Sequence, residues 1–217
     1  MSVGCVVLGV DIGASKVRVG AFDATSGALR RRAVTRYATS GFSGLLPVLE
    51  QFLRESGITT VDAIAVGVAG AVTGNRATMT NLPWVVESDA IEVALGARKA
   101  VVMNDLVAHG YGVLELAPGD YETLRSGAAK PGNRALIAAG SGLGQCVLHW
   151  TGERFLPIPS EGGHATFGPR HADDVALATF LLSRHPDHVS WERVVSGRYG
   201  FRNLYDFLRT SDAVEEP

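Results

Sequence analysis

The sequence is poor in cysteine, which limits the metal and redox chemistry open to it. Its 217 residues include two cysteines, Cys5 and Cys146, and neither belongs to a closely spaced pair. This spacing argues against a cysteine zinc site. Each cysteine lies in an apolar run, which favours buried thiols in a reducing compartment, although a disulfide stays open as the alternative.

The sequence also lacks a strong charge excess and a long apolar run. Its formal net charge is −2, which argues against a general affinity for nucleic acid or for an anionic membrane. The run Arg30–Arg32 suits a solvated loop or a small basic patch. No stretch is long enough to span a bilayer, and the N-terminus lacks the basic region of a signal peptide. We therefore expect a cytoplasmic protein with no nucleic-acid or membrane partner.

Glycine is abundant and clustered. Among 26 glycines, groups follow apolar runs at Gly13, Gly67–Gly70, Gly140–Gly144 and Gly162–Gly163. Glycine lets a backbone approach a ligand closely. Clusters at the ends of strands therefore predict ligand contacts rather than flexible linkers.

The first pattern is a meander of three strands. Apolar or alternating runs at Cys5–Val10, Val17–Phe22 and Leu29–Tyr37 are separated by short turns, which is typical of successive antiparallel strands. The first turn, Asp11–Ser15, can bind phosphate, because Gly13 admits close approach and the N–H groups of the turn can face oxygen. Ser15 adds a hydroxyl donor, and Asp11 can hold Mg²⁺ through water. An ordinary hairpin turn is the alternative.

A possible catalytic base follows a later strand. Val101–Met103, preceded by Lys99-Ala100, predicts a buried strand, and Asn104-Asp105 lies between it and an apolar helical stretch reaching Leu116. Ligands of open α/β sheets bind beyond the carboxyl ends of strands. There, Asp105 can take a proton from a hydroxyl that Asn104 orients. The alternative is that Asn104 or Asp105 only caps the next helix.

The rest of the first half alternates helix and strand. Helices are expected at Leu45–Leu53 and Ala90–Leu95, and a strand at Ala63–Val68. Ser43 and Ser88 are the predicted caps, and Gly57 and Gly96 the predicted stops. Asn81 suits either a turn or a polar ligand. Residues 1–118 are thus predicted to form one α/β lobe, and the Gly- and Pro-rich residues 119–132 a connection to a second lobe at 119–217.

The second half of the chain repeats the order of strand, glycine-containing turn and returning strand with which the chain begins. Strands are expected at Arg134–Ala139, Gln145–Trp150 and Arg154–Ile158, with the glycine turn Gly140–Gly144 after the first of them. Two related lobes that each offer a phosphate-binding turn would hold phosphate in a cleft. Further on, helices are expected with apolar faces that we assign to Val175, Ala178, Leu181 and Leu182, and to Phe201, Leu204, Tyr205 and Leu208.

Two polar segments of the second half suit a polyol ligand. Glu161 and His164 flank two glycines, and together a carboxylate and a neutral imidazole accept and donate hydrogen bonds to hydroxyls. Glu192 lies in the first turn of a short helix predicted to be capped by Ser190. For Glu192, favourable interaction with the helix dipole is the alternative.

Together these motifs resemble the bacterial glucokinases of the hexokinase type, in the superfamily of sugar kinases, Hsp70 and actin. A related group with a cysteine-rich zinc motif is a poorer match, because that motif is absent. The matching segments, in the order of the family, are Gly9–Lys16, Met79–Trp84, Asn104-Asp105, Ala139–Gly144, Glu161–His164 and Ser190–Gly197.

The resemblance implies a two-lobed, actin-like (ribonuclease H-like) α/β fold that phosphorylates glucose with ATP and Mg²⁺. Asp105 falls on the catalytic base, and a homodimer is one expected assembly. The sugar-binding candidates are Asn104, Asp105, Glu161, His164 and Glu192, together with Asn81. The phosphate-binding candidates are Asp11, Gly13, Ala14, Ser15, Lys16, Gly140, Ser141 and Gly142, with Asp11 as the metal-binding residue.

The sequence departs from the family in two respects. Leu106-Val107 and Ser141 replace residues that are common in the family. More important, family members continue well beyond the equivalent of Pro217, into the adenosine-binding glycine segment and a final helix. The second lobe is therefore expected to be incomplete and the chain to associate through exposed apolar surface. The alternative function is a glucose-binding relative with weak or no catalysis.

Overall fold

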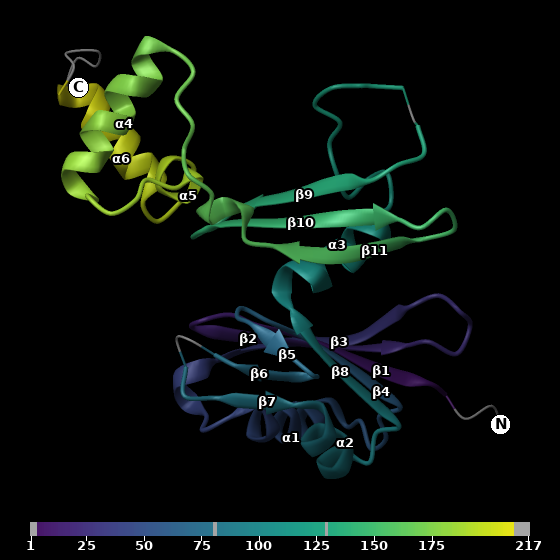
Figure 1. The fold of residues 1–217 in the computed structure, drawn as a ribbon. Helices are drawn as coiled ribbons and strands as arrows, with labels where there is room; N and C mark the ends of the chain where they lie inside the picture. Colours follow the sequence, from purple (N-terminus) through teal and green to yellow (C-terminus); the bar gives the residue numbers. More distant parts are fainter. Residues whose placement is uncertain (1–3, 80–81, 129, 211–217) are drawn as a thin grey trace. The chain divides into compact units, whose positions relative to one another are not determined.

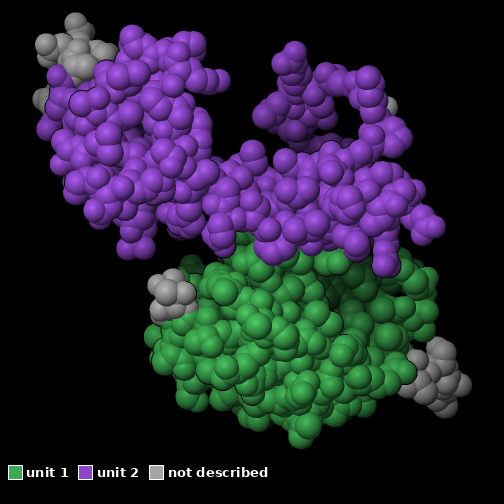
Figure 2. Space-filling model, in the orientation of Figure 1, with its two compact units in different colours: residues 1–113 green, residues 114–217 purple. Residues whose placement is uncertain are grey.

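The computed structural model describes residues 4–79, 82–128 and 130–210. They form two compact units, residues 1–113 and 114–217 (Figure 2). Cys146 is buried and Cys5 partly exposed, and both are free thiols. Within the described ranges, no helix combines the length and the apolar character needed to cross a membrane.

A five-stranded sheet with the order β3-β2-β1-β4-β8 organises the first unit (Figure 1). β1, β2 and β3 pair antiparallel, which confirms the predicted meander, while β4 and β8 continue the sheet in parallel with β1. Ile12, Val68 and Asn104 lie in register, so the three parallel strands end at one edge. The strands are β1 (Val6–Ile12), β2 (Lys16–Asp23), β3 (Arg30–Ala38), β4 (Ala63–Val68) and β8 (Lys99–Asn104).

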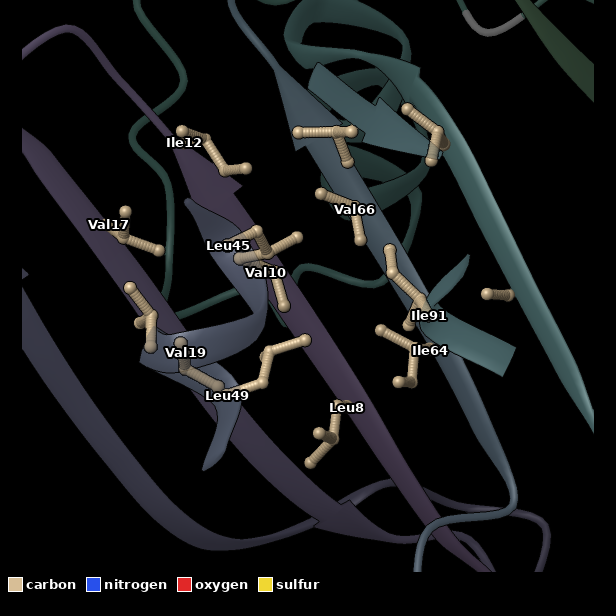
Figure 3. Close-up of a cluster of buried hydrophobic side chains, with 14 of the residues drawn as sticks. Leu8, Val10, Ile12, Val17, Val19, Leu45, Leu49, Ile64, Val66 and Ile91 are labelled. Carbon is tan, nitrogen blue, oxygen red and sulfur yellow. The ribbon is translucent and has the colours of Figure 1, made fainter. Parts of the chain in front are cut away.

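One face of this sheet carries the core of the unit. The helices α1 (Leu45–Ser56) and α2 (Ser88–Leu95) cover it, and Figure 3 shows their side chains against those of β1, β2 and β4. Burial of each such Leu, Ile or Val contributes about 1.5–3 kcal/mol. The fully or nearly fully buried contacts include Leu8, Val10, Ile12, Val17, Val19, Leu45, Leu49, Ile64, Val66 and Ile91.

The helix α3 (Asp105–Leu114) packs on the opposite face. Ile64, Val66 and Val68 alternate into the core, so Gly67 faces the other way. A Cβ at Gly67 would lie 3.0 Å from the Cβ of Ala108. Glycine at this position therefore lets α3 lie directly on β4.

The predicted helix stops are confirmed, but the predicted caps are wrong. Gly57 and Gly96 end α1 and α2 in the left-handed conformation, with φ of 67° and 63°. Gly44, not Ser43, precedes α1, so Ser43 lies one residue too early to cap it. Ser88 is already helical, and its hydroxyl bonds to the Asp89 carboxylate.

A small second sheet in this unit was not predicted. It contains β5 (Val72–Thr73), β6 (Arg76–Thr78) and β7 (Val85–Glu87), in a part of the chain where no strand was expected. Strands of two or three residues are too short to show an alternating pattern. The buried side chains of Ala77 and Val86 hold this sheet against the core.

The second unit contains the predicted second meander. β9 (Arg134–Ala139), β10 (Leu143–Trp150) and β11 (Phe155–Ser160) pair antiparallel in the order β11-β10-β9. The single-turn helix η2 (Gly162–His164) follows β11. Figure 1 shows the remaining helices gathered at one end of this sheet.

These helices are α4 (Ala172–Arg184), α5 (Trp191–Val194) and α6 (Gly200–Thr210). The predicted apolar face of α4 is partly wrong, because Val175 and Leu182 are about half exposed. Leu177 and Leu181, one turn apart, are the buried pair. They pack with Leu204 and Phe207 of α6, while the other residues of its predicted apolar face, Phe201, Tyr205 and Leu208, are exposed.

Candidate functional site

Asp11 and Asp105 approach the same end of the first sheet. Asp11 pairs with Arg18 of β2 and with Gly67 of β4, and its side chain is exposed. Asp105 begins α3 directly after β8. A Cβ at Gly67 would lie 3.6 Å from the Cα of Asp105. Gly67 therefore brings the backbone of Asp105 next to the row that contains Asp11.

The environment of Asp105 makes its carboxylate a better proton acceptor. Burial raises the pKa of its carboxyl, and the negative charge of Asp11 raises it further. The Leu106 N–H, 2.9 Å from Oδ1, and the imidazole of His109 act in the opposite direction. The net effect is a raised pKa, and a carboxylate with a raised pKa is a better general base near neutral pH.

Asn104 does serve as a helix cap, as the alternative interpretation suggested. Its Oδ1 accepts a hydrogen bond from the Leu106 N–H at 2.9 Å, and its Nδ2 donates to the Gly70 carbonyl at 3.2 Å. Asn104 thereby ties α3 and the loop after β4 to the end of β8. An amide nitrogen carries two hydrogens, so the bond to Gly70 leaves one donor for a ligand.

The turn between β1 and β2 is held by a residue that the sequence did not single out. Its own closing bond runs from the Gly13 N–H to the Lys16 carbonyl at 3.0 Å. Thr39, which is buried, donates its N–H to the Ser15 carbonyl and its hydroxyl to the Ala14 carbonyl, both at 3.1 Å. No local pattern could reveal this role, because Thr39 lies 24 or 25 residues after the turn.

The same turn offers free donors to a ligand. Ala14 and Ser15 are exposed, and their N–H groups bond to none of the described residues. Successive N–H groups in a tight turn form an anion-binding concavity. Lys16, also exposed, is the next residue in the chain. Asn81, the remaining candidate of this unit, lies outside the described residues.

The glycine turn of the second unit is backed by the segment after α5. The Gly140 N–H donates to the Gly142 carbonyl at 3.0 Å, which closes the turn. Gly197 donates its N–H to the Gly140 carbonyl at 2.7 Å, and Arg198 donates to the Ser141 carbonyl at 3.1 Å. These two hydrogen bonds therefore fix the predicted turn against the segment after α5.

Glu192 contacts this turn directly. Its Oε2 accepts a hydrogen bond from the Leu143 N–H at 3.1 Å. A Cβ at Gly142 would lie 2.8 Å from the same oxygen, so only glycine leaves room for the carboxylate. Ser190 precedes α5 but makes no side-chain capping bond, contrary to the prediction.

Glu161 and His164 lie beside the same strand. His164 Nε2 is 3.7 Å from Glu161 Oε2, and both side chains are largely exposed. A Cβ at Gly163 would overlap the Leu143 carbonyl oxygen, and one at Gly162 would overlap the side chain of Gln145. The two glycines thus seat this loop on β10. The second unit therefore brings Glu161, His164, Glu192 and Gly140–Gly142 together around the start of β10.

The site residues do not form a metal centre by themselves. Within the parts of the chain that are described, no group of three His, Cys, Asp or Glu side chains could hold an ion. Two cavities of about 440 and 210 Å³ lie elsewhere in the first unit. The larger is lined by Val6, at the end of β1 away from Asp11. The candidate site is therefore identified by the positions and the chemistry of its side chains rather than by the volume of a cavity.

Comparison with known proteins identifies the family of the chain. The glucokinase family model matches residues 8–217. A glucokinase of Nostoc punctiforme is 36% identical over 184 residues, which cover 83% of this chain and 54% of the relative. The chain spans about half the length of the curated relatives that it matches first.

Solved structures show the same fold. A glucokinase from an Antarctic psychrotroph, 25% identical, superposes with a TM-score of 0.83 over 98% of this chain and 66% of that one. The glucokinase of Balamuthia mandrillaris in complex with glucose, 19% identical, gives 0.71 over 98% of this chain and 65% of that one. The predicted actin-like α/β fold is confirmed, and the chain belongs to the glucokinase family.

Proposed function

We propose that the protein that contains this chain transfers the γ-phosphoryl group of ATP to glucose, with Asp105 as the general base. One observation carries the proposal. In a chain of the glucokinase family, a half-buried carboxylate with a raised pKa lies at the end of β8, near Asp11 and the turn that follows it. This is the combination that a hydroxyl-to-phosphate transfer requires.

In this reaction the sugar 6-oxygen attacks the γ-phosphorus of ATP while Asp105 accepts the proton of that hydroxyl, and the bond from the γ-phosphorus to the leaving ADP breaks. The second donor of the Asn104 amide orients the sugar. Glu161, His164 and Glu192 bond to the other hydroxyls. Carboxylates accept from hydroxyls, whereas a neutral imidazole both accepts and donates. Glucose is the sugar that the B. mandrillaris enzyme holds in its structure, which supports this choice of substrate.

The two turns are assigned to the phosphates of ATP. The N–H groups of Ala14 and Ser15, with Gly13 and Lys16, contact one phosphate, and Gly140, Ser141 and Gly142 contact another. Asp11 fits Mg²⁺, because that ion is usually held by one or two carboxylates together with phosphate oxygens and water. Bound Mg²⁺ would neutralise the charge that develops on the transferred group.

A second candidate function is a glucose-binding protein with weak or no catalysis. It is favoured by one observation, that the sugar-binding candidates Glu161, His164 and Glu192 lie together around the start of β10 within one unit. Phosphoryl transfer depends on positioning both substrates. A chain that holds the sugar residues without a full nucleotide site would bind glucose but turn over slowly.

Two measurements on the same sample separate these functions. One is the rate of ATP-dependent glucose phosphorylation, and the other is glucose affinity by calorimetry. We expect turnover that falls about 10²–10⁴-fold in Asp105→Asn, the usual contribution of a general base. Glucose binding without turnover would favour the second function. A folded sample that binds no glucose would exclude both.

A further inference from the structure

Glu192 is one of the sugar-binding candidates, and it also contacts the second glycine turn. Its Oε2 accepts the Leu143 N–H at 3.1 Å, immediately after the turn. That oxygen would lie 2.8 Å from a Cβ at Gly142, so the carboxylate lies against the turn itself. Its other oxygen, Oε1, bonds to none of the described residues and stays available to a ligand.

The other bonds to the turn come from the same short segment. Gly197 and Arg198, which donate to Gly140 and Ser141, follow Glu192 by five and six residues. The N-terminal end of this segment is anchored as well, because the Trp191 N–H donates to the Ala165 carbonyl at 3.0 Å. Residues 191–198 therefore connect the loop after His164 to the glycine turn.

We infer that Glu192 is a positioning residue for the Gly140–Gly142 turn as well as a sugar contact, so that glucose binding orders the turn. This inference rests on the proposed function. A sugar hydroxyl that donates to Oε1 restricts the torsions of the side chain, so that Oε2 accepts the Leu143 N–H for a larger fraction of the time. Such coupling is reciprocal. Glucose would raise the affinity for nucleotide phosphates, and nucleotide would raise the affinity for glucose by the same factor.

The experiment follows the exchange of the Leu143 amide hydrogen by NMR, with and without saturating glucose. In the unaltered protein we expect glucose to slow this exchange about tenfold, within the 5–150-fold range of typical coupling. Glu192→Ala removes the acceptor, so exchange should be fast with or without glucose. Glu192→Gln keeps an acceptor oxygen and should retain part of the response.

His164→Ala is the matched control. It removes a proposed sugar contact but leaves the bond between Glu192 and Leu143 in place. At saturating glucose its Leu143 amide should respond as in the unaltered protein, although more glucose is needed. If Glu192→Ala does not fold, as judged by circular dichroism, a smaller response in Glu192→Gln than in the unaltered protein would support the coupling, and an equal response would overturn it.

The possible failures are distinct. Glucose binding in calorimetry with no change at Leu143 would overturn the coupling and leave the proposed function standing. An equal response in Glu192→Ala would also overturn it, because the signal would then bypass the carboxylate. A folded protein that binds no glucose would overturn the proposed function and the coupling together.

Discussion

The charge on Asp11 raises the pKa of Asp105, although 94 positions separate the two residues in the sequence. The connection runs through the sheet. β1 carries Asp11 and pairs with β4, while β8, which pairs with β4 in turn, leads into Asp105. We therefore expect the proton affinity of the candidate base to depend on the residue assigned to the metal.

Asp11→Asn should lower the pKa of Asp105, because it removes a negative charge that disfavours ionisation. NMR titration of the Asp105 carboxyl measures this directly and requires no turnover. Glu122→Gln, in the exposed segment after α3, removes the same charge at a site absent from the interactions of Asp105 and is the control. An unchanged titration in Asp11→Asn would show that the two carboxylates do not interact.

Asp105→Asn should keep or increase stability at neutral pH while it lowers turnover about 10²–10⁴-fold. Burial raises the folded-state pKa of Asp105, so the contribution of this group to stability is greatest at low pH and decreases as pH rises through the folded-state value. Asn does not ionise, so the substitution removes this decrease in stability at higher pH. Thermal unfolding at pH 3.5, below the ordinary Asp pKa of 3.8, and at pH 7 should show a larger gain at pH 7. A variant that is less stable at both pH values would contradict this assignment.

Gly67→Ala should move α3 away from β4. The added Cβ would lie 3.0 Å from the Cβ of Ala108, and overpacking of this kind typically costs about 1–3 kcal/mol. Urea unfolding gives the loss of stability, and the activity assay reports the displacement of Asp105. The control is Gly112→Ala, which lies in α3 itself but whose added Cβ would have no neighbouring atom within 4 Å, so it should be neutral or stabilising.

Thr39→Val should weaken phosphate binding and cause only a small loss of stability. It removes the hydroxyl bond to the Ala14 carbonyl but keeps the N–H bond to Ser15. The loss of one hydrogen bond costs about 1 kcal/mol, whereas the turn that it positions carries the exposed N–H donors. Calorimetry with ATP and Mg²⁺ should show several-fold weaker binding, and Thr39→Ser should restore it. Equal affinities in the Val and Ser variants would exclude a role for the hydroxyl.

Leu181→Ala and Leu182→Ala test which face of α4 is buried. Leu181 is fully buried and Leu182 about half exposed. A buried Leu→Ala change costs about 2–5 kcal/mol, whereas the same change at an exposed position costs about 0.5 kcal/mol or less. Urea unfolding should therefore separate these neighbours clearly. Similar losses in both variants would contradict the packing of α4 on α6.

Local sequence was enough to predict much of the secondary structure of this chain. Both meanders, the ends of α1 and α2 at Gly57 and Gly96, and the position of Asn104-Asp105 after a strand follow from short-range patterns. Such patterns reflect φ/ψ preferences and side-chain alternation over a few residues. The strands β5–β7 are too short to carry them, so they were missed.

Tertiary structure alone decided which contacts hold the candidate site in place. Thr39 supports a turn 24 or 25 residues earlier, Gly67 seats α3, and Glu192 holds the N–H of Leu143, 49 residues away. The buried face of α4 likewise depends on α6. These contacts arise when packing brings distant segments together, and no spacing along the chain encodes which partner a side chain will meet.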